Sequence, residues 1–335
     1  MLRFCFARER YLCGMSGSTL VIAHRGACGY RPEHSRAAYE LAIAQGADAV
    51  ETDVVSSSDG VLVVRHENEL SLSTDIASRP EFRSRHRSQD IDGELVTGWF
   101  TEDFTWDELS TLTCAEPLPL LRPDCVEFAG TPILRLADLM QILDEADASV
   151  ALVLELKHAT HFERLGLPLE AALARELEVA RWRRDDERLI IESFELSILR
   201  IVSELGIGAK HVYLLDDTGA APDQVALLGA HAPTYASQMM LENLPALVQA
   251  VDGISIPVSI AVSDEGHRVI ERCHELGMAV YTFTLRPENK FLPVVWRLGF
   301  DPRAMGNWQG FFDEVLDSGV DGVFVDHPDL VGHRP

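Results

Sequence analysis

The chain has 335 residues, of which 47% are hydrophobic and 24% are charged. These proportions are typical of globular proteins and exclude a chain that is largely disordered. The length allows two domains, or one α/β barrel that carries an insertion. The 29 basic and 53 acidic side chains give a net charge of −24, which argues against nucleic acid and anionic lipid surfaces as partners and favours small ligands and metal cations.

Residues 1–18 are expected to form a disordered leader, with Met15 as an alternative start. Charged residues interrupt the apolar run that a secretory signal needs, so the sequence favours a cytoplasmic location over export. Apolar runs such as 150–154 are far shorter than the ~20 residues of a membrane-spanning helix, so no transmembrane segment is predicted. Six scattered cysteines indicate reduced thiols. We expect residues 19–335 to form a single domain.

Short apolar runs alternate with amphipathic stretches, a pattern that predicts a parallel α/β fold. The candidate strands are residues 19–24, 49–54, 61–66, 150–155, 189–193, 211–215, 253–256, 279–284 and 322–326. The six residues between the second and third runs are too few for a crossover helix, and Asp59-Gly60 is a hairpin signal. One strand of this pair is therefore expected to lie outside an eight-stranded barrel.

Helices are predicted between the strands at residues 34–45, 168–182, 196–205 and 265–276. Residues 69–131 are polar and lack sustained periodicity, and they are too many for an ordinary loop. We interpret them as an insertion after the third strand that covers the functional site and has a small aromatic core of its own.

The second strand carries two carboxylates, Glu51 and Asp53, at alternate positions. Alternation places both side chains on one face, about 7 Å apart, where like charges repel unless a cation or protons intervene. A divalent metal ion satisfies this requirement. The alternative is an exposed edge strand whose acidic side chains are solvated.

Three other strands end in residues that carry chemistry. His24-Arg25 follows the first strand, His66 the third and Glu155-x-Lys157 the fourth. The carboxyl ends of barrel strands face the active site. Each motif alone has a structural alternative, such as a Glu155–Lys157 ion pair, but four such strand ends together indicate a site.

Charge and donor type suggest what this site binds. Three carboxylates without a cysteine or a second close histidine suit a hard cation, Mg²⁺ or Ca²⁺. Arg25 and Lys157 supply two positive charges that could neutralise a phosphate diester beside the metal, and His24 and His66 remain for proton transfer.

These residues closely resemble the motifs of the glycerophosphodiester phosphodiesterase family. The likeness extends in order over roughly residues 20–330. Its motifs are His24-Arg25-Gly26, Pro32-Glu33-His34, Glu51-x-Asp53, Asp59-Gly60, His66, residues 98–105, Thr131-Pro132-Ile133-Leu134, Glu155-x-Lys157, Glu192-Ser193-Phe194, Tyr281-Thr282-Phe283, Glu288-Asn289 and residues 319–326.

The resemblance implies a TIM-type (β/α)8 barrel of the PI-PLC-like phosphodiesterase architecture. It implies hydrolysis of small-molecule glycerophosphodiesters to sn-glycerol 3-phosphate and an alcohol, in lipid and glycerol metabolism. By its motifs, Glu51, Asp53 and Glu155 are the metal ligands, His24 and His66 the acid/base pair, and Arg25 and Lys157 the phosphate contacts. The insertion is similar to that of longer bacterial members, which tend to use Ca²⁺ rather than Mg²⁺.

One departure concerns Glu67, which stands where the family usually has aspartate and which would orient His66 from one methylene further away. Two alternative functions are open: a lysophospholipase D-like enzyme acting on lipid diesters, and a non-catalytic barrel that binds sugar phosphates. The histidines without a strand-end pattern are expected to be structural: His86, His158, His161, His211 and His231.

Overall fold

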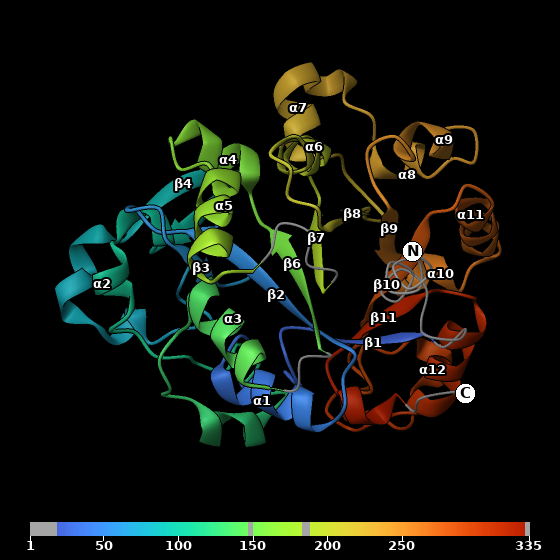
Figure 1. The fold of residues 1–335 in the computed structure, drawn as a ribbon. Coiled ribbons are helices and arrows are strands. Elements are labelled where there is room, and N and C mark those ends of the chain that lie inside the picture. Colours follow the sequence, from blue (N-terminus) through green and yellow to red (C-terminus); the bar gives the residue numbers. More distant parts are fainter. Residues whose placement is uncertain (1–18, 147–149, 183–187, 332–335) are drawn as a thin grey trace.

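The protein is described by a computed structural model that covers residues 19–146, 150–182 and 188–331, and the predicted leader lies outside these residues. Eight parallel strands form a barrel, closed where β1 pairs with both β2 and β11 (Figure 1). In barrel order they are β1 (Leu20–Ala23), β2 (Ala49–Ser56), β6 (Ala151–Leu156), β7 (Leu189–Ser193), β8 (Lys210–Leu214), β9 (Gly253–Pro257), β10 (Ala279–Leu285) and β11 (Gly322–Val325). The predicted TIM-type fold is confirmed.

The third of the nine predicted strands, β3 (Leu62–Val64), is not a barrel strand. It pairs antiparallel with the end of β2, Val54 opposite Val64. The chain reverses at Gly60, whose φ of +77° lies in the left-handed region that favours glycine. The predicted hairpin is therefore confirmed, and it explains why nine strand patterns yield eight barrel strands.

Helices surround the barrel, and the four predicted helices are present with ends within three residues of those expected. The helices are α1 (Arg36–Ala44), α2 (Trp106–Leu109), α3 (Leu136–Glu145), α4 (Ala159–Arg164), α5 (Leu169–Val179), α6 (Leu196–Glu204), α7 (Pro222–Leu228), α8 (Tyr235–Gln238), α9 (Leu244–Leu247), α10 (Val258–Ala261), α11 (Asp264–Glu275) and α12 (Trp308–Asp317). Helix α1 starts after Ser35, whose side chain accepts a hydrogen bond from the Ala38 amide.

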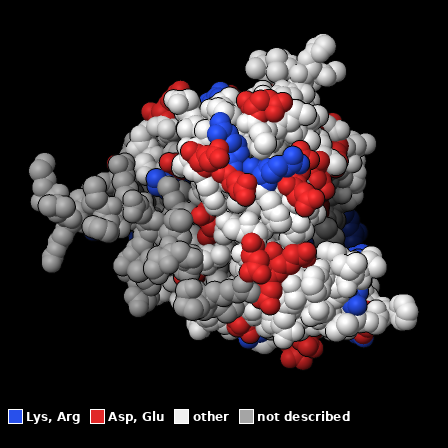
Figure 2. Space-filling model, turned by 90° about the vertical axis from the view of Figure 1, so that its right-hand side faces the viewer, with Lys and Arg blue, Asp and Glu red and all other residues white. Residues whose placement is uncertain are grey.

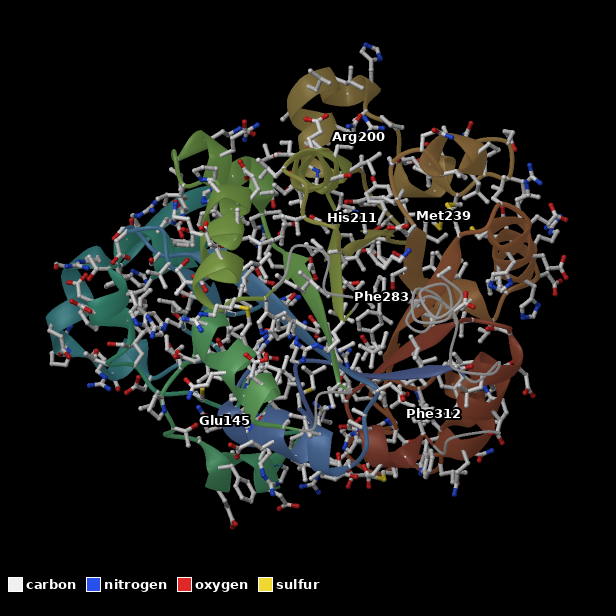
Figure 3. All side chains as sticks on the ribbon, viewed as in Figure 1. Glu145, Arg200, His211, Met239, Phe283 and Phe312 are labelled. Carbon is white, nitrogen blue, oxygen red and sulfur yellow. The ribbon has the colours of Figure 1, made fainter. Side chains whose placement is uncertain are left out.

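The apolar residues form two buried clusters, one inside the barrel and one between its outer face and the helices. Phe312 of α12 belongs to the outer cluster, and its side chain is labelled in Figure 3. The inner cluster includes Ala49, Ala151, Val153 and Ile190. Because strand residues alternate between faces, the next inward positions on these strands carry acidic side chains, and the interior changes from apolar to charged toward the carboxyl ends.

The segment of residues 69–131 lies between β3 and α3. It contains α2 and a hairpin of β4 (Arg87–Ile91) and β5 (Glu94–Gly98), which the sequence reading missed. The expectation of a separate aromatic core is wrong. Phe82 and Phe104, whose ring centroids are 5.1 Å apart, belong to the same cluster as the residues between the barrel and its helices.

The surface agrees with the acidic composition. On the face drawn in Figure 2, acidic side chains cover more area than basic ones.

Four cysteines, Cys28, Cys114, Cys125 and Cys273, are free thiols. Among the helices of the described residues, none is long and apolar enough to cross a membrane.

Candidate active site

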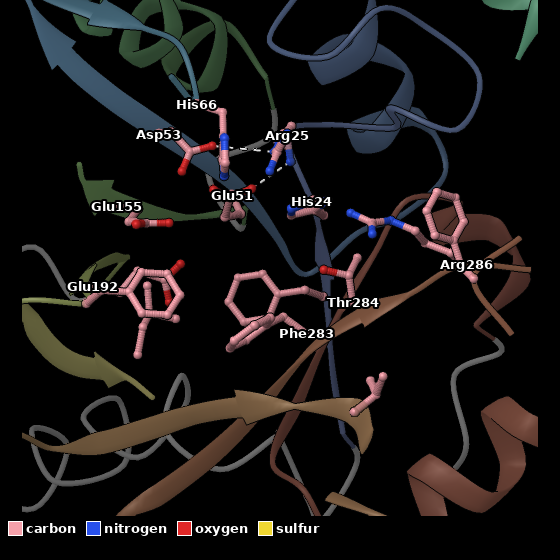
Figure 4. Close-up of a pocket in the computed structure, with 15 residues that line it drawn as sticks. His24, Arg25, Glu51, Asp53, His66, Glu155, Glu192, Phe283, Thr284 and Arg286 are labelled. Atoms are coloured by element: carbon pink, nitrogen blue, oxygen red, sulfur yellow. Dashed lines mark hydrogen bonds and ion pairs between the residues drawn. The ribbon is translucent and has the colours of Figure 1, made fainter. Parts of the chain in front are cut away.

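A cavity of about 350 Å³ opens at the carboxyl ends of the barrel strands (Figure 4). The structure brings seven sequence-predicted site residues together here. Six of them line the cavity: His24, Arg25, Glu51, Asp53, His66 and Glu155. The seventh, Lys157, lies next to one of these lining residues, with its Nζ 3.1 Å from Glu155 Oε1.

Three carboxylates converge because of strand register. Asp53 of β2 stands opposite Glu155 of β6, and Glu51 is two residues earlier on the same face of β2. One oxygen from each carboxylate lies within 4.8 Å of the others, and all three side chains are buried. This arrangement can hold a metal ion, whereas the alternative of a solvated edge strand is wrong.

The carboxylates differ in how readily they ionise. Burial raises the pKa of Glu51 well above its usual value, and Asp53 and Glu192 add to the effect. Burial also raises the pKa of Glu155 to about 8, although Lys157 opposes it. At Asp53 burial would raise the pKa, but the electrostatic effect of His66, a hydrogen bond with His34 and the charges of Lys157 and Arg25 outweigh it and hold the pKa well below normal. A bound cation would favour the ionised form of all three carboxylates.

Arg25 lies in the turn that follows β1 and has a left-handed φ of 55°. This conformation points its backbone N–H at Glu51, and the amide donates to Oε2 at 2.7 Å. The guanidinium donates to Glu33 at 2.8 Å, and its Nε lies 3.5 Å from Asp53 Oδ2 (Figure 4). Arg25, whose side chain is partly buried, therefore places a fixed positive charge beside the carboxylates.

His24, at the end of β1, is held by the last barrel strand. Its Nδ1 donates to Asp326 Oδ1 at 2.7 Å, which leaves Nε2 as the nitrogen not engaged by Asp326. Burial and the charge of Arg25 lower the pKa of His24 to about 4, despite the opposing effect of Asp326. His24 is therefore neutral near pH 7 and can accept a proton.

His66 is held on both nitrogens. Its Nδ1 donates to Glu67 Oε1 at 2.7 Å, and Nε2 accepts from Lys157 Nζ at 3.2 Å. Burial and the charges of Arg25 and Lys157 lower its pKa to about 4. Both candidate catalytic histidines therefore lie beside cations and have pKa values well below that of a free imidazole.

Two residues at or next to this site were given no site role from the sequence. Glu192 of β7 stands in register with Glu155, lines the cavity and is 2% exposed, and burial raises its pKa well above normal. An acidic residue at the end of an apolar strand, the pattern that singled out Glu155, was present here too. His158, expected to be structural, lies behind Glu67 with its Nε2 3.4 Å from Oε2.

Comparisons with known proteins agree with this geometry. Residues 24–330 match the glycerophosphoryl diester phosphodiesterase family. A glycerophosphodiester phosphodiesterase of Arabidopsis thaliana is 28% identical over 91% of this chain and 82% of its own length. One of Bacillus subtilis is 24% identical over 93% of this chain and 84% of its own length.

Solved structures show the same fold. A protein from Silicibacter pomeroyi superposes with a TM-score of 0.68 at 22% identity, covering 97% of this chain and 95% of its own. A phosphodiesterase from Oleispira antarctica, solved in complex with the product sn-glycerol-3-phosphate, gives a TM-score of 0.61 at 23% identity, covering 93% and 94%. The chain belongs to the glycerophosphoryl diester phosphodiesterase family and is accordingly a phosphoric diester hydrolase.

Proposed function

We propose that the protein hydrolyses glycerophosphodiesters to sn-glycerol 3-phosphate and an alcohol, with a divalent metal ion and two histidines. The observation that carries this proposal is the convergence of three carboxylates, two histidines and Arg25 on one cavity. The Oleispira antarctica phosphodiesterase, with the same fold, was solved with that product.

The residues present suit a hard divalent cation. Glu51, Asp53 and Glu155 offer carboxylate oxygens, and Oδ1 of Asp53 is buried without a hydrogen-bond partner among the described residues. Such oxygens match the preference of Ca²⁺ and Mg²⁺, and we favour Ca²⁺ because of the likeness to longer bacterial members. When bound, the cation would supply positive charge that stabilises negative charge developing on the substrate.

Arg25 and Lys157 are suited to hold the non-bridging phosphate oxygens. Arg25 lines the cavity, and Lys157 Nζ lies between Glu155 and the Nε2 of His66. The two cations oppose the repulsion between an anionic diester and the carboxylates, and they stabilise charge that develops on phosphorus-bound oxygens.

The histidines carry the proton transfers. Each donates through Nδ1 to a carboxylate, His24 to Asp326 and His66 to Glu67, so Nε2 is the nitrogen left for proton transfer, and in His66 it contacts Lys157 Nζ before substrate binds. One histidine removes a proton from the nucleophile and the other gives a proton to the departing alcohol oxygen. A bound phosphate anion would raise the low pKa of the histidine that acts as acid. The family resemblance suggests the glycerol 2-hydroxyl as nucleophile, followed by opening of a cyclic phosphate by water with the roles reversed.

The test is an assay of purified protein with glycerophosphocholine and lysophosphatidylcholine, after chelation and after adding back Ca²⁺ or Mg²⁺. We expect release of sn-glycerol 3-phosphate from the first substrate only with a divalent ion, and faster with Ca²⁺. Turnover of lysophosphatidylcholine alone would support the lysophospholipase D-like alternative instead. Full activity after exhaustive removal of divalent ions would overturn the metal-dependent mechanism.

A further inference from the structure

A second cavity, of about 220 Å³, adjoins the first. Its lining includes residues of the 69–131 segment, and it shares four residues with the first cavity: His24, Arg25, His66 and Arg286. In Figure 4, His24, Arg25 and Arg286 lie on the side of the site opposite Glu155 and Glu192. A phosphate held at this junction would extend one of its two ester arms into each cavity.

We propose that the second cavity holds the departing alcohol and selects an alcohol that carries a positively charged amino group. The assignment rests on the proposed diester hydrolysis and goes beyond it, because it names the class of leaving group. The first cavity, lined by the metal-binding carboxylates, then receives the glycerol arm.

The charges of the second cavity are unevenly paired. Each arginine in its lining bonds to a carboxylate: Arg25 to Glu33, Arg122 to Asp326 and Glu288, and Arg286 to Asp326. Glu67 in turn is paired with His66 and His158. Two carboxylates of the lining, Glu69 and Glu116, form no ion pair with any of the described residues, and they accept hydrogen bonds only from neutral donors such as the Trp99 and Leu118 amides. The balance left for a ligand is therefore negative.

Glu116 offers the clearest contact point for a cation. The residue is 7% exposed, and Oε1 accepts from the Leu118 amide at 2.9 Å. Oε2 is buried and has no hydrogen-bond partner within the described parts of the chain. Burial raises the pKa of Glu116 to about 7, opposed by Arg122 and reinforced by Glu33 and Asp326. A cationic ligand would supply the partner that Oε2 lacks and favour the carboxylate form.

The remaining walls suit alkyl groups around that charge. Leu72, Pro117 and Leu118 line the same cavity as Glu116. An alkylammonium alcohol such as choline or ethanolamine can place methyl or methylene groups on these side chains and its charge near Glu116. An anionic alcohol would be repelled by Glu67, Glu69 and Glu116, and a neutral alcohol would leave Oε2 unpaired.

The experiment compares two diesters that differ only in charge. One is glycerophosphocholine, and the other is the 3,3-dimethylbutyl diester of glycerol 3-phosphate, in which carbon replaces the quaternary nitrogen. We expect the wild-type enzyme to show a kcat/KM ratio of at least ~10 in favour of choline, the discrimination produced by one desolvated charge contact. Choline should also inhibit hydrolysis of either diester, whereas 3,3-dimethylbutanol at equal concentration should inhibit much less.

The variant that tests the assignment is Glu116→Gln, which keeps the shape of the side chain and removes its charge. We expect the ratio to fall to about 3 or less, with most of the change in the choline value. The matched control is Glu127→Gln, at an exposed position of the same segment, which should leave the ratio unchanged. Circular dichroism would establish that both variants are folded.

The outcomes separate this inference from the proposed function. A wild-type ratio near 1, or a ratio that Glu116→Gln leaves unchanged, would overturn the charged-alcohol assignment while diester hydrolysis stands. Hydrolysis of neither diester in the presence of Ca²⁺ or Mg²⁺ would overturn the proposed function and this assignment with it.

Discussion

The imidazole of His158 lies behind the carboxylate of Glu67, with Nε2 of His158 3.4 Å from Glu67 Oε2. The other oxygen of Glu67 accepts from His66 at 2.7 Å, and the Nδ1 of His158 donates to Asp92 at 2.5 Å. Asp92 is the first of the two turn residues between β4 and β5. The hairpin is thus connected to the candidate catalytic histidine through two ionisable side chains, which makes His158 a candidate positioning residue.

This chain of contacts predicts a pH dependence of stability. Burial disfavours the charged form of His158, but Asp92 and Glu67 outweigh it and raise the pKa to about 9. A pKa raised above the unfolded value of 6.5 means that the imidazolium stabilises the fold fully below about pH 6.5 and loses this effect as pH rises through 9. The variant His158→Gln should lack this component, which is worth up to about 2 kcal/mol.

Urea unfolding at pH 6.5 and pH 9 measures the effect. The difference in unfolding free energy between wild type and His158→Gln should shrink at the higher pH, whereas the exposed-residue control His231→Gln should show no such change. An equal difference at both pH values would mean that His158 is not charged in the folded protein.

A second prediction concerns the two histidines of the cavity. His24→Ala and His66→Ala should each lower kcat by at least ~10²-fold, because proton transfer in the transition state is lost. The double variant should lose much less than the product of the two, since the residues act as a unit. Calorimetric titration with Ca²⁺ should show metal binding retained. Near-normal activity in either single variant would refute the assignment.

A third prediction concerns Arg25. In Arg25→Lys the charge is retained, but an ammonium cannot reproduce the planar fork that donates to Glu33 and faces Asp53. We expect kcat/KM to fall by about 10²-fold, the magnitude for loss of one stabilising donor. Arg303→Lys, at an exposed position, is the control. Wild-type kinetics in both Arg25→Lys and Lys157→Ala would require the phosphate contacts to be reassigned.

Much of the fold and site was predictable because both depend on local periodicity. Alternation within β2 placed Glu51 and Asp53 on one face, and the structure has them there. The β4–β5 hairpin was not predicted although Asp92-Gly93 is a strong turn signal, and Glu192 was given no site role although it ends an apolar strand like Glu155. Both features follow from local rules that the sequence satisfies.

Other features depend on contacts between distant segments and have no local pattern. Arg122 reaches Asp326 across 204 positions of sequence, and His158 meets Asp92 across 66. The lowered pKa values of His24 and His66 have the same origin, because burial beside Arg25 exists only in the folded barrel. Motif spacing can suggest which residues react, but not the environment that sets their protonation.

The last prediction concerns Asp326, a buried carboxylate that follows β11 and accepts hydrogen bonds from three side chains. It accepts from His24 at 2.7 Å, from Arg122 at 2.6 Å and from Arg286 at 2.8 Å. The variant Asp326→Asn leaves two guanidinium groups without their shared anion and faces them with an amide that also donates. Since breaking a buried ion pair leaves uncompensated charge, we expect the unfolding free energy to fall by about 3 kcal/mol.

Asp326 also fixes the ring of His24, so its loss should affect the reaction separately from stability. At a temperature where the Asp326→Asn protein remains folded, kcat should fall by at least ~10-fold with little change in KM, because the tautomer and orientation of His24 are no longer fixed. The pH profile of kcat should change shape in this variant. The control Asp329→Asn, three residues later and exposed, should change neither quantity. A variant that is less stable but has the wild-type kcat and pH profile would limit Asp326 to a structural role.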